Sequence, residues 1–136
     1  MKIDDIYQQV LGGIFIAWGI LGMSFPTYFT EKFFTPSFVG VMGVTPALNL
    51  VMRYLGSVCT VCGVIILSSK FTVTTYRNLA LAMLPYFIVD YYFWSTGVLT
   101  TLAVGGDCTF GAICIACCAA GYKTAAGVPK EPKKDK

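Results

Sequence analysis

The chain has 136 residues, of which 56% are hydrophobic and only 12% are charged. A soluble domain carries about 25% charged residues, so this composition argues against an ordinary soluble enzyme and predicts an integral membrane protein. The net charge of +3 is modest, and the basic residues are not interleaved with base-stacking aromatics, so we expect no nucleic-acid partner. Histidine is absent, which excludes histidine-ligated haem or pigment and removes the usual general base.

Four apolar segments account for most of the length. A bilayer core of about 30 Å requires roughly 20 apolar helical residues per crossing, so the chain has room for four crossings and little else. We expect helices at residues 6–29, 46–69, 76–95 and 98–122. Residues 1–122 would then form an all-α integral membrane four-helix bundle with both termini on the same side. The segment 123–136 is polar, lysine-rich and proline-containing, which predicts a flexible tail.

The first apolar segment carries glycines at helical spacing. Gly12, Gly19 and Gly22 fall near one face, which favours close approach of a neighbouring backbone. Pro26 closes the segment. Between the first two crossings, residues 27–45 are rich in aromatics and broken by proline, which predicts a short interfacial helix at headgroup level. A docking surface for a partner is the alternative interpretation of these aromatics.

The remaining crossings have recognisable boundaries. Thr45 followed by Pro46 is typical of a helix N-cap with proline at the first helical position. Pro85 should kink the third crossing, which ends in the aromatic stretch DYYFWST, typical of a membrane interface. The fourth crossing begins near Val98 or only at Asp107, and we favour Val98 because 107–122 alone is short for a span.

The distribution of basic residues predicts the orientation. With four crossings, the termini and the loop between the second and third helices share one side. That side holds Lys2, Lys70, Arg77, Lys123, Lys130, Lys133, Lys134 and Lys136. The positive-inside rule therefore predicts that both termini are inside.

Two cysteine-containing stretches resemble each other, GSVCTVCGV at 56–64 and GAICIACCA at 111–119. Small residues recur there at four-residue steps, which is the pattern of close contact between membrane helices. Cys59 lies roughly 20 Å along its helix from Pro46, near the middle of a bilayer, where a thiol behaves as a small apolar group. We therefore interpret both stretches as packing surfaces. The residues concerned are Gly56, Cys59, Gly63, Gly111, Cys114 and Cys118.

Thiol chemistry is the alternative for the cysteines. Quinone-coupled membrane oxidoreductases, such as the vitamin K epoxide reductase family and the bacterial disulfide-bond formers, use a CxxC pair in a four-helix scaffold. The pair Cys114 and Cys117 resembles theirs, with Cys108 as a further candidate thiol. The resemblance implies reactive cysteines near a membrane surface and companion cysteines in a loop, and this chain lacks that arrangement. It also lacks paired CxxC knuckles in polar loops, so we expect no metal site.

Buried charges form the most informative constellation. Arg53 and Asp90 lie about 10 Å and 9 Å from the outer ends of their helices, and Asp107 reaches the same level if its helix begins near Val98. Charges inside hydrocarbon normally pair, so we predict an Arg53–Asp90 ion pair. Asp107 would be a third member of this cluster or a helix cap at the surface, and Asn49, one turn before Arg53, could complete the hydrogen bonds. The alternatives are a site for a headgroup, quinone or small substrate beside Tyr91 and Tyr92, and a transport function.

These features favour a non-catalytic accessory or assembly subunit of a larger membrane complex, respiratory or photosynthetic. Its partners would be other membrane subunits and lipids, in an organelle inner membrane or thylakoid, with no intrinsic cofactor and only peripheral lipid, quinone or pigment contact. The runner-up is a quinone-linked thiol-disulfide oxidoreductase, and the second alternative is a small carrier or a lipid- or quinone-binding protein. The outline is similar to small four-helix membrane families such as the DoxX-like proteins, which implies architecture only.

Overall fold

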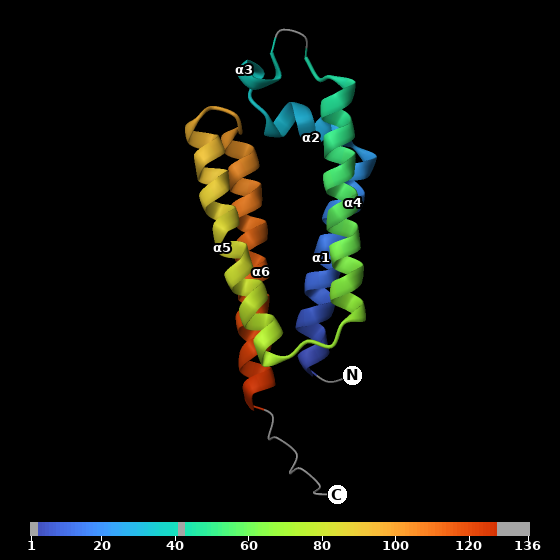
Figure 1. Cartoon of the computed structure of the whole chain (residues 1–136), viewed down its shortest axis with the longest axis vertical. Coiled ribbons are helices and arrows are strands. Elements are labelled where there is room, and N and C mark those ends of the chain that lie inside the picture. The colour runs from blue at the N-terminus through green and yellow to red at the C-terminus, as the bar shows by residue number, and fades with distance from the viewer. Residues whose placement is uncertain (1–2, 41–42, 128–136) are drawn as a thin grey trace, which may run out of the picture.

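The structure is a computed structural model that describes residues 3–40 and 43–127, with side chains from Ile6 onward. Every regular element in the described residues is a helix. These helices are α1 (Ile3–Ser24), α2 (Pro26–Phe33), α3 (Pro36–Val39), α4 (Pro46–Ser68), α5 (Val73–Ser95) and α6 (Thr101–Gly127). Figure 1 shows two long helix pairs, α1 with α4 and α5 with α6. The short helices α2 and α3 lie at one end of the molecule, and both chain termini lie at the other.

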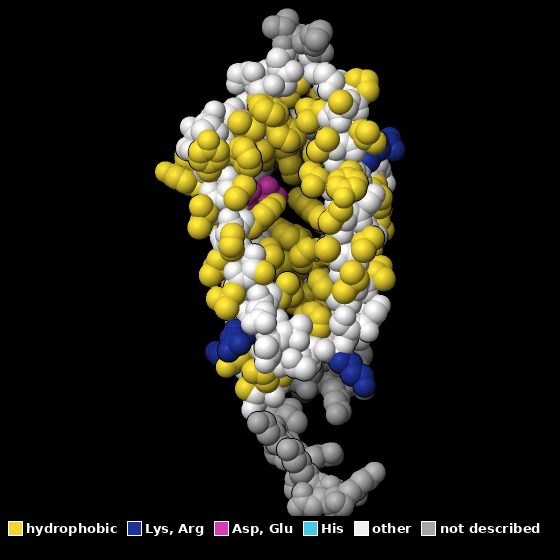
Figure 2. All heavy atoms as spheres, viewed as in Figure 1, with side chains coloured by type: hydrophobic (Ala, Val, Ile, Leu, Met, Phe, Trp, Pro, Cys, Tyr) yellow, Lys and Arg dark blue, Asp and Glu magenta, His cyan; other side chains and the backbone are white. Residues whose placement is uncertain are grey.

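Three helices are long and apolar enough to cross a membrane: α1 over Ile6–Ser24, α4 and α6. The 23 residues of α5 match them in length, but Arg77, Asn78 and Asp90 lower its apolar character. Large apolar side chains are exposed over much of the visible surface (Figure 2). Such a surface is compatible with a membrane protein, because hydrocarbon chains solvate it without cost.

Glycines hold α1 against α4. A Cβ added at Gly19 would come within 2.5 Å of the Gly56 carbonyl oxygen, and one added at Gly63 within 2.7 Å of the Gly12 carbonyl oxygen. Both distances lie below any normal carbon contact, so the two backbones touch directly at these levels. Gly22 lies farther from α4, because its added Cβ would make an ordinary contact of 3.5 Å with Gly56.

The second pair, α5 and α6, uses glycine differently. Gly111 faces the ring of Phe87, and an added Cβ there would lie 2.5 Å from the nearest ring carbon. Gly121 faces the ring of Tyr76 equally closely, so an added Cβ would clash with that ring. In this pair, the absence of a side chain at each glycine leaves the space that an aromatic ring of α5 occupies. Pro85 lies inside α5 without ending it.

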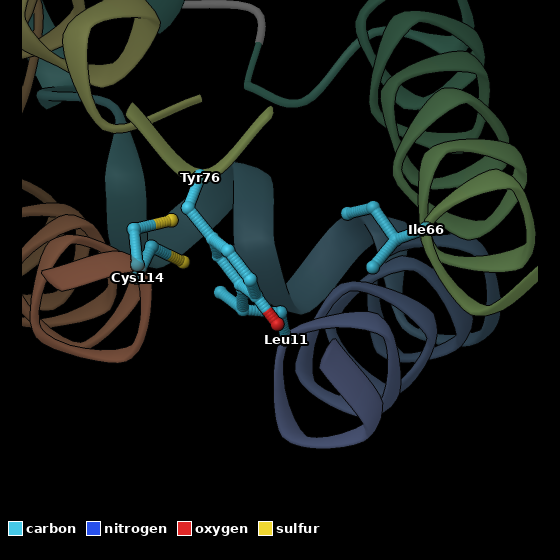
Figure 3. Packing of buried hydrophobic residues seen from close by; sticks show 5 residues of the cluster. Leu11, Ile66, Tyr76 and Cys114 are labelled. Carbon is cyan, nitrogen blue, oxygen red and sulfur yellow. The ribbon is translucent and has the colours of Figure 1, made fainter. Parts of the chain in front are cut away.

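A compact apolar cluster joins the two pairs at the end of the bundle near the termini (Figure 3). It consists of Leu11, Ile66, Tyr76, Cys114 and Cys118, one or two from each long helix. Tyr76 is the largest fully buried side chain, with 1% of its surface exposed. The cluster contains residues of α1 and α6, which are in direct contact, so it fixes the spacing of the pairs at that end.

A backbone connection joins the pairs at the opposite end. Phe34, just after α2, forms an antiparallel bridge with Leu99 in the α5–α6 turn. The Thr35 amide donates to the Val98 carbonyl at 3.0 Å, and the Thr100 amide donates to the Phe33 carbonyl at 2.8 Å. We call residues 33–35 and 97–100 the strap. No sequence pattern predicts the strap, because a single bridge leaves no alternation of apolar and polar residues.

Several predicted boundaries differ from the observed ones. The first helix ends at Ser24, not at residue 29, because Pro26 begins α2 as an N-terminal proline. The interfacial segment holds two short helices, α2 and α3, in place of one.

The other boundaries follow their caps. The predicted cap at Thr45 is confirmed, since its hydroxyl accepts from the Leu48 amide at 3.2 Å. A capping box at Thr72 starts α5 earlier than predicted. Helix α6 continues through Gly105 and Gly106 and includes residues 123–127, which we expected in the tail. The rest of that predicted tail, 128–136, lies outside the described residues.

Candidate functional site

A cavity of about 270 Å³ lies between the two helix pairs, towards the strap. Helix α4 packs against α1 and α2, and α5 packs against α6, and Figure 2 shows a hollow between the two pairs. Acidic side-chain atoms are visible in the wall of this hollow. Phe34 and Leu99 of the strap also line the cavity and close the end of it that lies nearest the strap. The cavity therefore opens sideways, between α4 and α5.

One wall of the cavity is aromatic. Trp18 of α1 stacks on Phe33 of α2 with ring centres 6.3 Å apart, and it meets Phe29 edge-on at 5.7 Å. Phe29 and Phe33 meet edge-on at 5.0 Å. Each ring is held by the other two, and Trp18 also stacks on Phe110 of α6 with ring centres 5.8 Å apart. The wall is therefore preformed, and neighbouring rings cover part of the Trp18 ring. Helix α2 lies across the end of the bundle because Pro26 turns the chain there.

The facing wall comes from α4. Met52, Leu55, Gly56 and Cys59 line it at steps of three and four residues, so one face of this helix forms the wall. The thiol of Cys59 is thus at the cavity surface, half-buried. Together the two walls make a mostly apolar enclosure.

Asp107 provides the polar end of the cavity, and a second buried carboxylate, Asp90, interacts with it from outside the lining. Asp107 of α6 lines the cavity and is 8% exposed, and Asp90 of α5 is 4% exposed. The α5–α6 turn places them at one level, since each lies about 9 Å along its helix from the turn. The Asp90 carboxylate acts electrostatically on Asp107, and the Tyr86 hydroxyl, one turn before Asp90, interacts with Asp107. Oxygen Oδ2 of Asp90 is buried without a hydrogen-bond partner among the described residues.

The structure does not bring Arg53 and Asp90 together. Arg53 is exposed on α4, and the described residues contain no salt bridge between it and either Asp90 or Asp107. Arg53 and Asp90 lie at similar distances from the ends of their helices, but the direction in which Arg53 points from α4 decides whether the two side chains meet. Met52 faces the cavity, so Arg53, turned about 100° further round the helix, faces outward.

Asn49 also has other partners than the predicted ones. Its amide donates to the Thr27 hydroxyl at 3.0 Å, and its oxygen accepts from the buried Thr30 hydroxyl at 3.4 Å. These bonds join the start of α4 to α2. Tyr91 and Tyr92, considered above as site residues, are exposed and do not line the cavity.

All six cysteines are free thiols. Cys114 and Cys118 are buried in the apolar cluster, and Cys117 packs partly against it. Cys108 is half-buried and lies about 9 Å along α6 from Cys114, so the three candidate redox thiols do not converge. No group of three or more histidine, cysteine or acidic residues suited to a metal ion occurs in the part of the chain that the structure describes.

Sequence reasoning selected both aspartates but missed the aromatic wall. The segment that contains Phe29 and Phe33 is interrupted by proline and partly polar, a pattern that predicts a position in the headgroup region. The available signal was Trp18, an aromatic with a polar edge in the middle of an apolar, glycine-rich span.

Comparison of the chain with protein-family models, with curated proteins and with solved structures gave no match.

Proposed function

We propose that this protein binds a small lipophilic molecule in the cavity between its helix pairs. The observation that carries the proposal is the cavity itself, an apolar enclosure with aromatic walls and one buried carboxylate, Asp107. Mostly apolar pockets with a few fixed polar groups are the usual form of small-molecule sites. The apolar walls would supply affinity, and the carboxylate would orient the ligand.

The volume limits the ligand. A cavity of about 150 Å³ holds benzene, so the 270 Å³ available here accommodates roughly ten non-hydrogen atoms. That is enough for a ring with a short substituent, or for the polar end of a longer lipid whose tail leaves through the sideways opening. A whole quinone with its isoprenoid tail would fit only in this second way.

We further propose that α5 is the fourth crossing and that both termini face the inner side. Support for the crossing comes from the packing of α5 along α6, a helix apolar enough to span. Support for the orientation comes from the concentration of lysine and arginine near both chain termini and around the α4–α5 loop. The expected organelle membrane remains a prediction.

The test is to purify the protein in mild detergent and identify co-purifying small molecules by mass spectrometry. Cys59→Phe should fill the cavity and remove the bound molecule. Val61→Phe is the matched control, because Val61 is 56% exposed on the same helix and does not line the cavity. Equal recovery of the same molecule from both variants would contradict the proposal.

An accessory-subunit role is a second proposal, favoured by one surface. Ile88, Tyr91 and Tyr92 of α5 are 71%, 64% and 60% exposed, and aromatic residues are enriched in interface cores. Lipid would cover the same surface, so its exposure is weaker support than the cavity. Native electrophoresis of gently solubilised membranes separates the two: migration in a large complex favours the subunit, and migration alone or as a small oligomer contradicts it.

Thiol-disulfide exchange has less support, because Cys114 is only 1% exposed and a reactive thiolate needs access. Replacing Cys108, Cys114 and Cys117 by alanine should leave ligand recovery unchanged. Loss of a thiol-dependent redox activity in that variant would favour thiol-disulfide exchange as the function.

A further inference from the structure

We propose that the bound molecule is a cation, a lipophilic amine or quaternary ammonium compound whose charged group lies between Asp107 and the aromatic wall of Trp18, Phe29 and Phe33. This inference rests on the proposed function and adds the charge of the ligand to it. It depends on the juxtaposition of two buried carboxylates with an aromatic wall.

The carboxylates lack a counter-charge. Asp107 lines the cavity, Asp90 interacts with it electrostatically from outside the lining, and both are more than nine-tenths buried. Among the described residues, the cavity lining contains no lysine or arginine. Asp90 also retains an unpartnered buried oxygen, Oδ2. Buried charges in proteins are normally paired, so this corner of the cavity is incomplete without a positive group. A cationic ligand completes it.

The aromatic wall favours the same ligand. Aromatic faces attract cations through the ring quadrupole, most strongly for tryptophan, and clusters of such rings are used to recognise quaternary ammonium groups. Trp18, Phe29 and Phe33 line the cavity and hold one another at centre distances of 5.0 to 6.3 Å. A methylated ammonium group suits such a wall better than a primary one, because it carries charge without requiring hydrogen-bond acceptors.

A neutral ligand would leave the two buried carboxylates without a counter-charge. A quinone or a neutral lipid could fill the volume, and a protonated Asp107 could donate to its carbonyl. In that case removing the carboxylate charge would have little effect on affinity. The charge of the ligand is therefore the quantity to measure.

The experiment compares two probes of one shape, benzyltrimethylammonium and its neutral carbon isostere neopentylbenzene. Equilibrium dialysis of the full chain in dodecyl maltoside micelles measures binding, and protein-free micelles correct for partition. We expect the wild type to bind the ammonium probe at least tenfold more tightly than the neutral one. Asp107→Asn should remove most of that preference and leave affinity for neopentylbenzene within twofold. Asp90→Asn should reduce the preference about threefold.

Glu31→Gln is the matched control, because it removes one carboxylate from α2 at an exposed position that does not line the cavity. It should change neither affinity. If Asp107→Asn does not fold, as judged by helix content and gel filtration, the wild type and Asp90→Asn still decide the question.

The outcomes are distinct. Equal binding of both probes to the wild type, or a preference that neither aspartate variant changes, overturns the cation inference while keeping the proposed cavity function. Failure of both probes to bind overturns the proposed function and this inference with it.

Discussion

Replacing Gly19 by alanine should weaken the packing of α1 on α4. The added Cβ would lie 2.5 Å from the Gly56 carbonyl oxygen and 2.6 Å from the Thr60 amide nitrogen, both backbone atoms that cannot rotate away. Ordinary contact begins at 3.4 Å, so the two helices must separate by about 1 Å at this level.

The expected cost follows from that separation. A gap of about 0.5 to 1 Å forfeits roughly a quarter to a half of the dispersion energy of the contacts it opens. Overpacking in a tight interface costs about 1 to 3 kcal/mol, and the better helix propensity of alanine offsets about 1 kcal/mol of it. We therefore expect Gly19→Ala to lower the free energy of unfolding by about 0 to 2 kcal/mol relative to the wild type, and by about 1 to 3 kcal/mol relative to a glycine-to-alanine change that makes no clash.

Gly13→Ala is the matched control on the same helix. No atom lies within 4 Å of the Cβ position at Gly13, so this variant keeps the propensity gain without the clash. Unfolding in micelles by titration with a denaturing detergent, followed by circular dichroism, measures both variants. Equal stability of the two would refute the conclusion that the α1 and α4 backbones are in direct contact.

Three further changes test other parts of the fold. Tyr76→Ala should cost about 3 to 5 kcal/mol in the same unfolding assay, because it empties the centre of the apolar cluster; a loss below 1 kcal/mol would mean that the cluster does not join the helix pairs. Thr100→Val removes the hydroxyl that donates to the Lys32 carbonyl at 2.6 Å and accepts from the Ala103 amide. We expect faster hydrogen exchange of the strap amides and about 1 to 2 kcal/mol of lost stability, and unchanged exchange would contradict the strap. Arg53→Leu should change the free energy of unfolding by less than about 0.5 kcal/mol, because the side chain is exposed. A loss of several kcal/mol would instead support an ion pair between Arg53 and Asp90.

The sequence was sufficient where one residue type imposes a local rule. Thr45 and Pro46 start α4 as predicted, because a hydroxyl cap and a fixed φ act within a single turn. Depth along a helix was also predictable, since the rise per residue is constant, and this placed Asp90 and Asp107 at one level.

Rotation around a helix was not predictable in the same way. Which face of α4 turns inward depends on the glycines opposite it in α1, and this choice sends Arg53 outward. The aromatic wall depends on Pro26 turning α2 across the bundle, a tertiary arrangement that no periodicity encodes.

The strap decides by which route a molecule reaches Asp107. Phe34 and Leu99 cover the outer end of the cavity, and the apolar cluster around Tyr76 fills the opposite end, so the lateral gap between α4 and α5 is the route that leads inside. If α4 and α5 both cross a membrane, as proposed, a ligand that enters by this route would come from the acyl-chain phase and not from bulk water. Occupancy would then follow the mole fraction of the ligand among the surrounding lipids, so a compound with weak intrinsic affinity but strong partition into the bilayer would still saturate the protein.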